Sequence, residues 1–257
     1  MLAQVTLTPA EGKRLIGKGI AAMEQVQSAL RQGTLIIATS TTTGYVVEEL
    51  LGQEIDKAHF TAGVVTADGC HITGGEHRYD HYVLRKGELT TMKTPELPPI
   101  LERMGPDDVF IKGANAIDCS GAAGILLAGI NGGTIGTAWG YLTANGVKTI
   151  IAAGLEKLVP TNLVDVARRT GRNKVDKSMG WACGMMVVHA DIVTEVEAFQ
   201  LLFEIEAIPI AGGGISGGEG ARVFLLEGDT EQTEAAFDLV MQIKGEPRLE
   251  CKTIPIP

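Results

Sequence analysis

The stretch 108-DVFIKGANAIDCSGAAG-124 begins as an apolar run and ends in a polar loop. The run 109-VFI-111 is typical of a strand inside a parallel sheet. Three polar side chains follow it, on Lys112, Asn115 and Asp118. Because open α/β sheets bind ligands at the carboxyl ends of their strands, these three residues are candidate catalytic residues.

Each of the three has a chemical role in this interpretation. Lys112 would neutralise a phosphate or carboxylate, Asn115 would hydrogen-bond a hydroxyl, and Asp118 would accept a proton or orient Lys112. The alternative is a salt-bridged strand end followed by an aspartate-capped turn.

Similar apolar runs lie on both sides of this stretch. Strands are predicted at 34-TLIIATS-40, 62-AGVVTA-67 and 148-KTIIAAG-154, and helices at 8–32, 43–52 and 131–145. The helix at 8–32 has a start signal at Thr8-Pro9. Strands without strict alternation, separated by helices, predict an α/β fold with a mostly parallel, three-layer sheet.

The order of elements changes after about residue 180. Strands are predicted at 185–192, 206–213, 221–228 and near 251–255, with helices at 195–205 and 230–243. This order predicts a smaller ferredoxin-like α+β lobe. We therefore expect two domains, an α/β ligand-binding domain at 1–180 and the α+β lobe at 181–257.

The composition excludes several classes of partner. The 257 residues carry a formal net charge of -9 and no basic run, so we expect no nucleic acid and no membrane partner. No apolar stretch is long enough for a membrane helix, and we predict a cytoplasmic protein. The four cysteines form no CxxC motif, which favours free thiols over a zinc site or disulfides.

The loop 39-TSTTTG-44 is a second candidate site, because hydroxyl residues follow a strand and precede a helix. Helix-start amides beside short hydroxyls suit a phosphate or carboxylate. The candidate ligand-binding residues here are Thr39, Ser40, Thr41 and Thr42. The alternative is a helix cap that binds nothing. The loop matches neither a Walker nor a dinucleotide motif, and we expect no cofactor.

Two further loops carry candidate ligand-binding residues. The loop 129-GINGGTIG-136 places Gly132, Gly133 and Thr134 before a helix, although glycine can serve the turn alone. Lys157 follows the predicted strand at 148–154, where an exposed ion pair with Glu156 is the alternative.

Two loops remain without an assigned role. In 70-CHITGGEHRYDH-81, His71, His77, Asp80 and His81 suggest a metal site, but Gly74-Gly75 favours a polar loop or lid, and we expect no metal. The glycine-rich stretch 211-AGGGISGGEGA-221 holds Glu219 and is either a mobile loop or a plain hairpin.

Part of the chain resembles a known superfamily. The segments 32-QGTLIIATSTTTGYVVEEL-50, 108-DVFIKGANAIDCSG-121 and 132-GGTIG-136 are similar to ribose-5-phosphate isomerase A, glucosamine-6-phosphate deaminase and CoA transferases. The resemblance covers about residues 15–160. It implies a sugar-phosphate loop around Gly113, and a homo-oligomer. Lys157 sits where sensing domains of related repressors often have a lysine.

The chain departs from the isomerase pattern at the acidic loop. The isomerase sequence Asp-Gly-Ala-Asp-Glu-Ile-Asp aligns without a gap on residues 112–118, so Lys112, Asn115 and Ala116 replace carboxylates. We therefore expect a cytoplasmic protein that binds a small anionic metabolite, phosphosugar or acyl-CoA-like, as a divergent isomerase-type or transferase-type enzyme. The alternatives are a non-catalytic binder or sensor of the same ligand class, and a structural protein.

Overall fold

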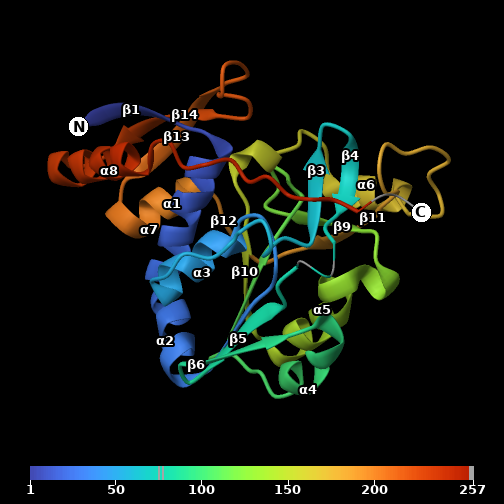
Figure 1. The fold of residues 1–257 in the computed structure, drawn as a ribbon. Helices are drawn as coiled ribbons and strands as arrows, with labels where there is room; N and C mark the ends of the chain where they lie inside the picture. Colours follow the sequence, from blue (N-terminus) through green and yellow to red (C-terminus); the bar gives the residue numbers. More distant parts are fainter. Residues whose placement is uncertain (75, 77, 255–257) are drawn as a thin grey trace.

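Six strands form the central sheet in the order β12-β10-β7-β2-β5-β6, in a computed structural model that describes residues 1–74, 76 and 78–254 (Figure 1). They are β12 (Asp191–Val193), β10 (Lys148–Ala152), β7 (Val109–Gly113), β2 (Thr34–Ile37), β5 (His81–Arg85) and β6 (Glu88–Met92). The first four run parallel, and β5 and β6 are antiparallel. The predicted α/β fold with a mostly parallel sheet is confirmed.

Hydrophobic side chains point to both faces of this sheet, and helices cover both. Leu35 and Ile111 pack into one core with α1 (Pro9–Ala22), α2 (Glu24–Gln32), α3 (Thr43–Leu51) and α7 (Glu195–Phe203). Ile36 and Phe110 pack into the opposite core with α4 (Pro98–Leu101) and α5 (Gly133–Asn145). Neighbouring residues of a strand face opposite sides of the sheet. The strands are apolar without alternation because both of their faces are covered by helices.

The predicted helix at 8–32 is divided into two. Its start is confirmed, since Thr8 caps α1 in a capping box with Glu11 and Pro9 follows the cap. Met23, however, has an extended backbone (φ -61°, ψ 128°) and separates α1 from α2. The turn lets Ile20 of the first helix and Val26 of the second reach the same core.

The small sheet does not have the predicted composition. It has the order β1-β14-β13, formed by β1 (Leu2–Leu7), β14 (Arg222–Glu227) and β13 (Glu206–Gly212), with α8 (Thr230–Ile243) beside it (Figure 1). The N-terminal strand therefore fills the place given to a strand near 251–255, where Thr253 forms an isolated bridge with Thr73 instead. The predicted ferredoxin-like order is wrong. Because β1 pairs with β14, a strand from before the predicted boundary at 180 belongs to the sheet that follows it.

The strand predicted at 185–192 is also divided. β11 (Gly184–Val188) joins a sheet of order β11-β9-β8 with β9 (Ala123–Leu127) and β8 (Ala116–Ile117). After a bend, β12 enters the central sheet beside β10. The remaining elements are α6 (Leu163–Arg169) and the short helices η1 (Thr94–Glu96), η2 (Ile130–Gly132) and η3 (Leu155–Lys157). None of the described helices is both long and apolar enough to cross a bilayer.

Two hairpins shape the region around the sheet. The predicted strand at 62–67 is β3 (Gly63–Thr66), which pairs with β4 (Gly69–Ile72) outside the central sheet. The β5–β6 hairpin was not predicted; its turn has positive φ at Lys86 and Gly87, as tight hairpin turns require. This hairpin brings His81, at the start of β5, to the carboxyl end of β2.

Candidate functional site: a cavity at the carboxyl edge of the sheet

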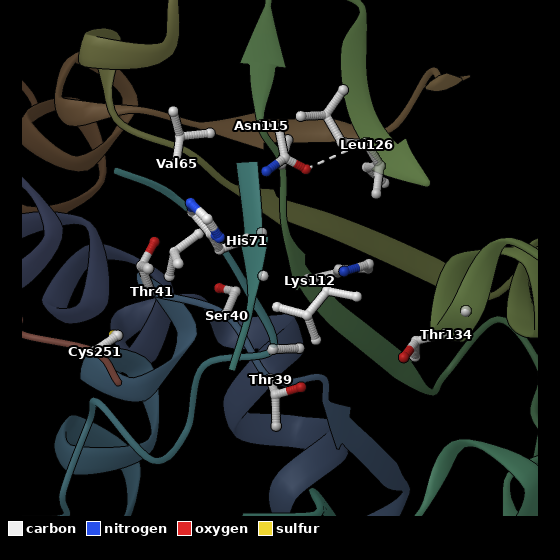
Figure 2. Close-up of a pocket in the computed structure, with 18 of the residues that line it drawn as sticks. Thr39, Ser40, Thr41, Val65, His71, Lys112, Asn115, Leu126, Thr134 and Cys251 are labelled. Atoms are coloured by element: carbon white, nitrogen blue, oxygen red, sulfur yellow. Dashed lines mark hydrogen bonds between the residues drawn. The ribbon is translucent and has the colours of Figure 1, made fainter. Parts of the chain in front are cut away.

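A cavity of about 1160 Å³ lies where the parallel strands end. Thr39, Ser40 and Thr41 follow β2, Lys112 lies near the end of β7, and Lys157 follows β10. These strands are neighbours in the sheet, so their carboxyl ends bring the residues to one edge. Figure 2 shows Lys112 and the Ser/Thr loop around the same pocket.

Lys112 has no counter-charge among the residues that the structure describes. The structure places no carboxylate in a salt bridge with its Nζ, and no hydrogen-bond partner, among residues 1–74, 76 and 78–254. Burial and the positive charge of Lys157 lower the pKa of Lys112 to about 8. The alternative of a salt-bridged strand end is therefore not what the structure shows for Lys112. An enclosed cation without a partner is typical of a binding site.

Lys157 lies in a cluster of charges behind the same cavity. Burial lowers its pKa to about 8, although Glu156 and Glu195 act in the opposite direction. Its own side chain forms no salt bridge within the described part of the chain. Glu156 pairs instead with Lys13, at 2.7 Å between Oε1 and Nζ. The exposed Glu156–Lys157 pair considered from the sequence is thus not formed.

Glu195 is a buried carboxyl that no sequence pattern identified. It is 3% exposed, and its Oε2 accepts a hydrogen bond from Leu155 N at 2.8 Å. A Cβ added to Gly154 would lie 2.1 Å from Glu156 Oε2 and 2.8 Å from Glu195 Oε1, so the two carboxyls are close neighbours. Burial and the charge of Glu156 raise the pKa of Glu195 to about 7.

The hydroxyls of the Ser/Thr loop have different roles. Ser40 Oγ accepts hydrogen bonds from the amides of Thr42 and Thr43, at 3.2 and 3.0 Å, and so caps α3. Thr39 and Thr41 line the cavity with Ser40. Thr42 is fully buried and is not among the lining residues. The cap interpretation is thus confirmed for Ser40, ligand binding by Thr39, Ser40 and Thr41 stays a prediction, and Thr42 lies outside the cavity lining.

Gly113 explains how the loop comes so close to β7. A Cβ added at Gly113 would lie 2.5 Å from Ser40 Oγ. Real Cβ atoms do not approach that closely, so only glycine fits between strand and loop. Gly113 also lines the cavity.

His81 links three parts of the site. Its Nδ1 accepts a hydrogen bond from Thr39 N at 3.2 Å, which leaves the proton on Nε2 to face Thr94 Oγ1 at 2.9 Å and Thr134 Oγ1 at 3.2 Å. Burial, assisted by the charge of Lys112, lowers the pKa of His81 to about 3. This imidazole is therefore a neutral connector at all ordinary pH values.

The glycine loop before α5 completes this side of the cavity. Gly132 and Gly133 line it and have positive φ angles of 73° and 60°, which explains the choice of glycine. Thr134 lines it too and is joined to Thr94 Oγ1 at 3.0 Å. The predicted residues of this loop are thus brought to the site.

Asn115 faces the cavity, whereas Asp118 does not line it. Asn115 Oδ1 accepts a hydrogen bond from Leu126 N at 2.9 Å, and its amide nitrogen points the other way, toward the side of His71 (Figure 2). Asp118 accepts hydrogen bonds from Ser120, Ala122 and Leu163. These bonds, first that of the Ser120 hydroxyl, lower its pKa to about 2. Asp118 anchors a turn, and its expected acid–base role has no geometric support.

Replacing Asp118 with alanine is expected to destabilise the protein by about 2 kcal/mol, because backbone amides lose a charged acceptor. Its pKa is lower in the folded state than the ordinary 3.8, so its contribution is present above pH 3.8 and is lost as the pH falls toward 2. Urea unfolding of the variant and wild type at neutral and acidic pH measures both effects. Ser120→Ala, which removes one donor, should have a smaller effect. Equal unfolding midpoints at neutral pH would contradict the anchoring role.

The β3–β4 hairpin and the C-terminal segment cover the cavity. Cys70 N donates to Met179 O at 3.2 Å, and Ile254 N donates to Ile72 O at 3.0 Å, so both neighbouring segments are tied to β4. Cys70 and Cys251 line the cavity with Cys183, and all four cysteines are free. Glu219 and Arg248 pair at 2.5 Å at the edge of the same cavity.

The described residues of the segment 70–81 do not form the metal site that was considered for it. Both ring nitrogens of His81 have hydrogen-bonding partners within the protein, and His77 lies outside the described residues. His71 lines the cavity from β4, as a lid residue would. No group of three potential metal ligands occurs in the described part of the chain.

Several buried polar atoms of residues that line this cavity lack a partner in the described part of the chain. Among the buried side-chain atoms without a hydrogen bond in the described residues, four belong to residues that line it: Tyr45 OH, His71 Nδ1, Glu156 Oε2 and Trp181 Nε1. Buried polar groups are normally paired, so four unpaired atoms in residues around one cavity are an unusual concentration. The sequence carries a signal for His71, which belongs to the loop 70–81, and for Glu156, which neighbours Lys157, but none for Tyr45 or Trp181.

Comparisons with known proteins add no family assignment. No protein-family model matches the chain, and a search of curated proteins finds no significant match. The resemblance to the isomerase superfamily therefore stays a prediction.

Proposed function

We propose that the protein binds a small metabolite with a dianionic group, and that it is a divergent enzyme of the isomerase or transferase type. The supporting observation is the pair of lysines, Lys112 and Lys157, which line one half-open cavity without forming salt bridges in the described structure. A phosphate beside them would supply the missing negative charge. The cytoplasmic location and the homo-oligomer stay predictions of the same proposal.

A phosphosugar fits the cavity better than an acyl-CoA-like compound. Tyr45 OH and Trp181 Nε1 can donate hydrogen bonds, and Glu156 Oε2 can accept one. A ligand with several hydroxyl or carbonyl groups would satisfy these atoms, whereas an acyl chain would leave them unpaired. Thr39, Thr41 and Thr134 add hydroxyls on the side of Lys112.

A non-catalytic binder or sensor is the second candidate, and the position of Asp118 favours it. The resembling isomerases need a carboxylate that moves a proton between adjacent carbons. Asp118 is fully occupied by backbone and Ser120 donors outside the cavity. Catalysis therefore requires another group, whereas binding does not.

A thermal-shift series tests the proposed binding. Phosphosugars and inorganic phosphate are expected to raise the unfolding midpoint, and the matched sugars without phosphate are not. A ligand at a hundredfold excess over its Kd stabilises the native state by about 2.7 kcal/mol. If no dianion at millimolar concentration shifts the midpoint, the proposed binding is wrong. Product analysis by NMR on any ligand that binds then separates the enzyme from the sensor.

A further inference from the structure

We propose that the cavity receives a phosphorylated aldehyde or ketone, and that Lys112 Nζ forms a reversible imine with its carbonyl carbon while Lys157 holds the phosphate. This inference rests on the proposed function and goes beyond it, because it names a covalent step and the class of substrate. It assigns the two lysines different tasks, which their surroundings support.

The position of Lys112 suits a nucleophile. β7 is hydrogen-bonded to β2 on one side and β10 on the other, so the backbone of Lys112 is held at the centre of the sheet. Both causes that act on its charge, burial and the nearby Lys157, favour the neutral amine. No described carboxylate forms a salt bridge with it to oppose them. A neutral amine in a cavity is the reactive form for attack on a carbonyl carbon.

Burial lowers the pKa of Lys157 as well, but at this lysine two carboxylates partly oppose the effect of burial. Glu156 and Glu195 both stabilise its ammonium group, and neither has an equivalent beside Lys112. Gly154 makes this arrangement possible, since a side chain there would displace the oxygens of both glutamates. Lys13 balances Glu156 through its own ion pair. Lys157 is therefore the better anchor for a phosphate, and its charge in turn makes Lys112 easier to deprotonate.

The covalent step balances without another reactant. The amine nitrogen adds to the carbonyl carbon, and the carbonyl oxygen becomes a hydroxyl that leaves as water with both amine hydrogens. A C=N bond replaces the C=O bond, and no oxidation occurs. Water drives the reverse reaction, so the cover formed by the β3–β4 hairpin and the C-terminal segment favours the imine. Once protonated, the imine withdraws electrons from the adjacent carbon, as aldose–ketose chemistry requires.

Reductive trapping tests the imine. Wild-type protein is incubated with glycolaldehyde phosphate and cyanoborohydride, which reduces imines to stable amines, and peptide mass spectrometry locates the adduct. Glycolaldehyde without phosphate is the matched probe. The expected result is an adduct on Lys112 that needs the phosphate and that inorganic phosphate suppresses by competition. Lys112→Arg, which keeps the charge but forms no such imine, should lose this adduct.

The outcomes separate the inference from the proposed function. Thermal stabilisation of Lys112→Arg by inorganic phosphate reports whether that variant is folded and binds. If phosphate stabilises wild type but the adduct is spread over surface lysines or is unchanged in Lys112→Arg, the imine is excluded and dianion binding stands. Adduct on Lys157 instead of Lys112 would reverse the assigned tasks and overturn the proposal. If phosphate neither stabilises nor competes, the proposed function itself fails.

Discussion

Replacing Lys112 and Lys157 together with methionine is expected to abolish binding of phosphate-containing ligands and, without ligand, to make the protein more stable. Each ammonium contributes a charged hydrogen bond of about 1.5–3 kcal/mol to a bound dianion, so the double change should lower affinity by several orders of magnitude. In the empty cavity, however, the two cations repel each other and have lost water. Methionine has a similar shape and no charge, so it removes that penalty.

Thermal unfolding with and without sulfate measures both effects in one experiment. Lys148→Met is the control, because Lys148 lies at the opposite end of β10 and forms a salt bridge with Asp191. This control should keep the stabilisation by sulfate and lose a little stability without it. If sulfate stabilises the double variant as much as wild type, the anion binds at a site away from Lys112 and Lys157. A double variant less stable than wild type would show that the two lysines stabilise the empty protein.

Sulfate affinity is expected to be constant below about pH 7 and to fall steeply above about pH 8. Sulfate keeps its charge throughout this pH range, so any change in its affinity reflects the ionisation of groups in the protein. Both lysines have a pKa of about 8 in the empty cavity, and a bound dianion raises it. Above pH 8, binding must therefore take up protons, and affinity falls by up to about tenfold per pH unit for each lysine. Calorimetry in buffers of different ionisation enthalpy measures the proton uptake.

The arginine variants provide the control. Lys112→Arg with Lys157→Arg keeps both positive charges above pH 8 and should bind sulfate with little dependence on pH. The stability of the empty wild-type protein is expected to depend on pH in the opposite direction from sulfate affinity. The lysines bind fewer protons folded than unfolded between pH 8 and their ordinary 10.5, so the free energy of unfolding should rise with pH there. Flat affinity across pH 8 would mean that neither lysine touches the anion.

The residues of the site could be predicted from the sequence where they follow a strand directly. Lys112 and Lys157 each come after an apolar run, and parallel strands in one sheet bring such positions to a common edge. The same reasoning gave the Thr39–Thr41 loop. It could not show that Ser40 also accepts hydrogen bonds from the first amides of α3, or that Thr42 is buried away from the cavity, because both depend on how α3 begins.

Other features depend on contacts between distant parts of the chain. Asp118 has the same sequence context whether it moves a proton or anchors a turn, and the amide of Leu163 helps to decide. His81 enters the site because the β5–β6 hairpin pairs with β2, and Glu195 because β12 pairs with β10. Hydrophobic patterns predict that strands form, but they do not say which strands become neighbours. The same ambiguity led to the wrong order in the small sheet.

The pairing of β1 with β14 has a consequence for how the chain folds. Residues 2–7 are synthesised long before their partner strand, residues 222–227. Contacts between such distant segments form slowly, because a long loop must close before they stabilise anything. Val5 and Leu7, buried in the finished protein, must therefore stay exposed on the ribosome while most of the chain emerges. We expect this strand to be a principal binding site for chaperones during synthesis, and the small sheet to be the last part to fold.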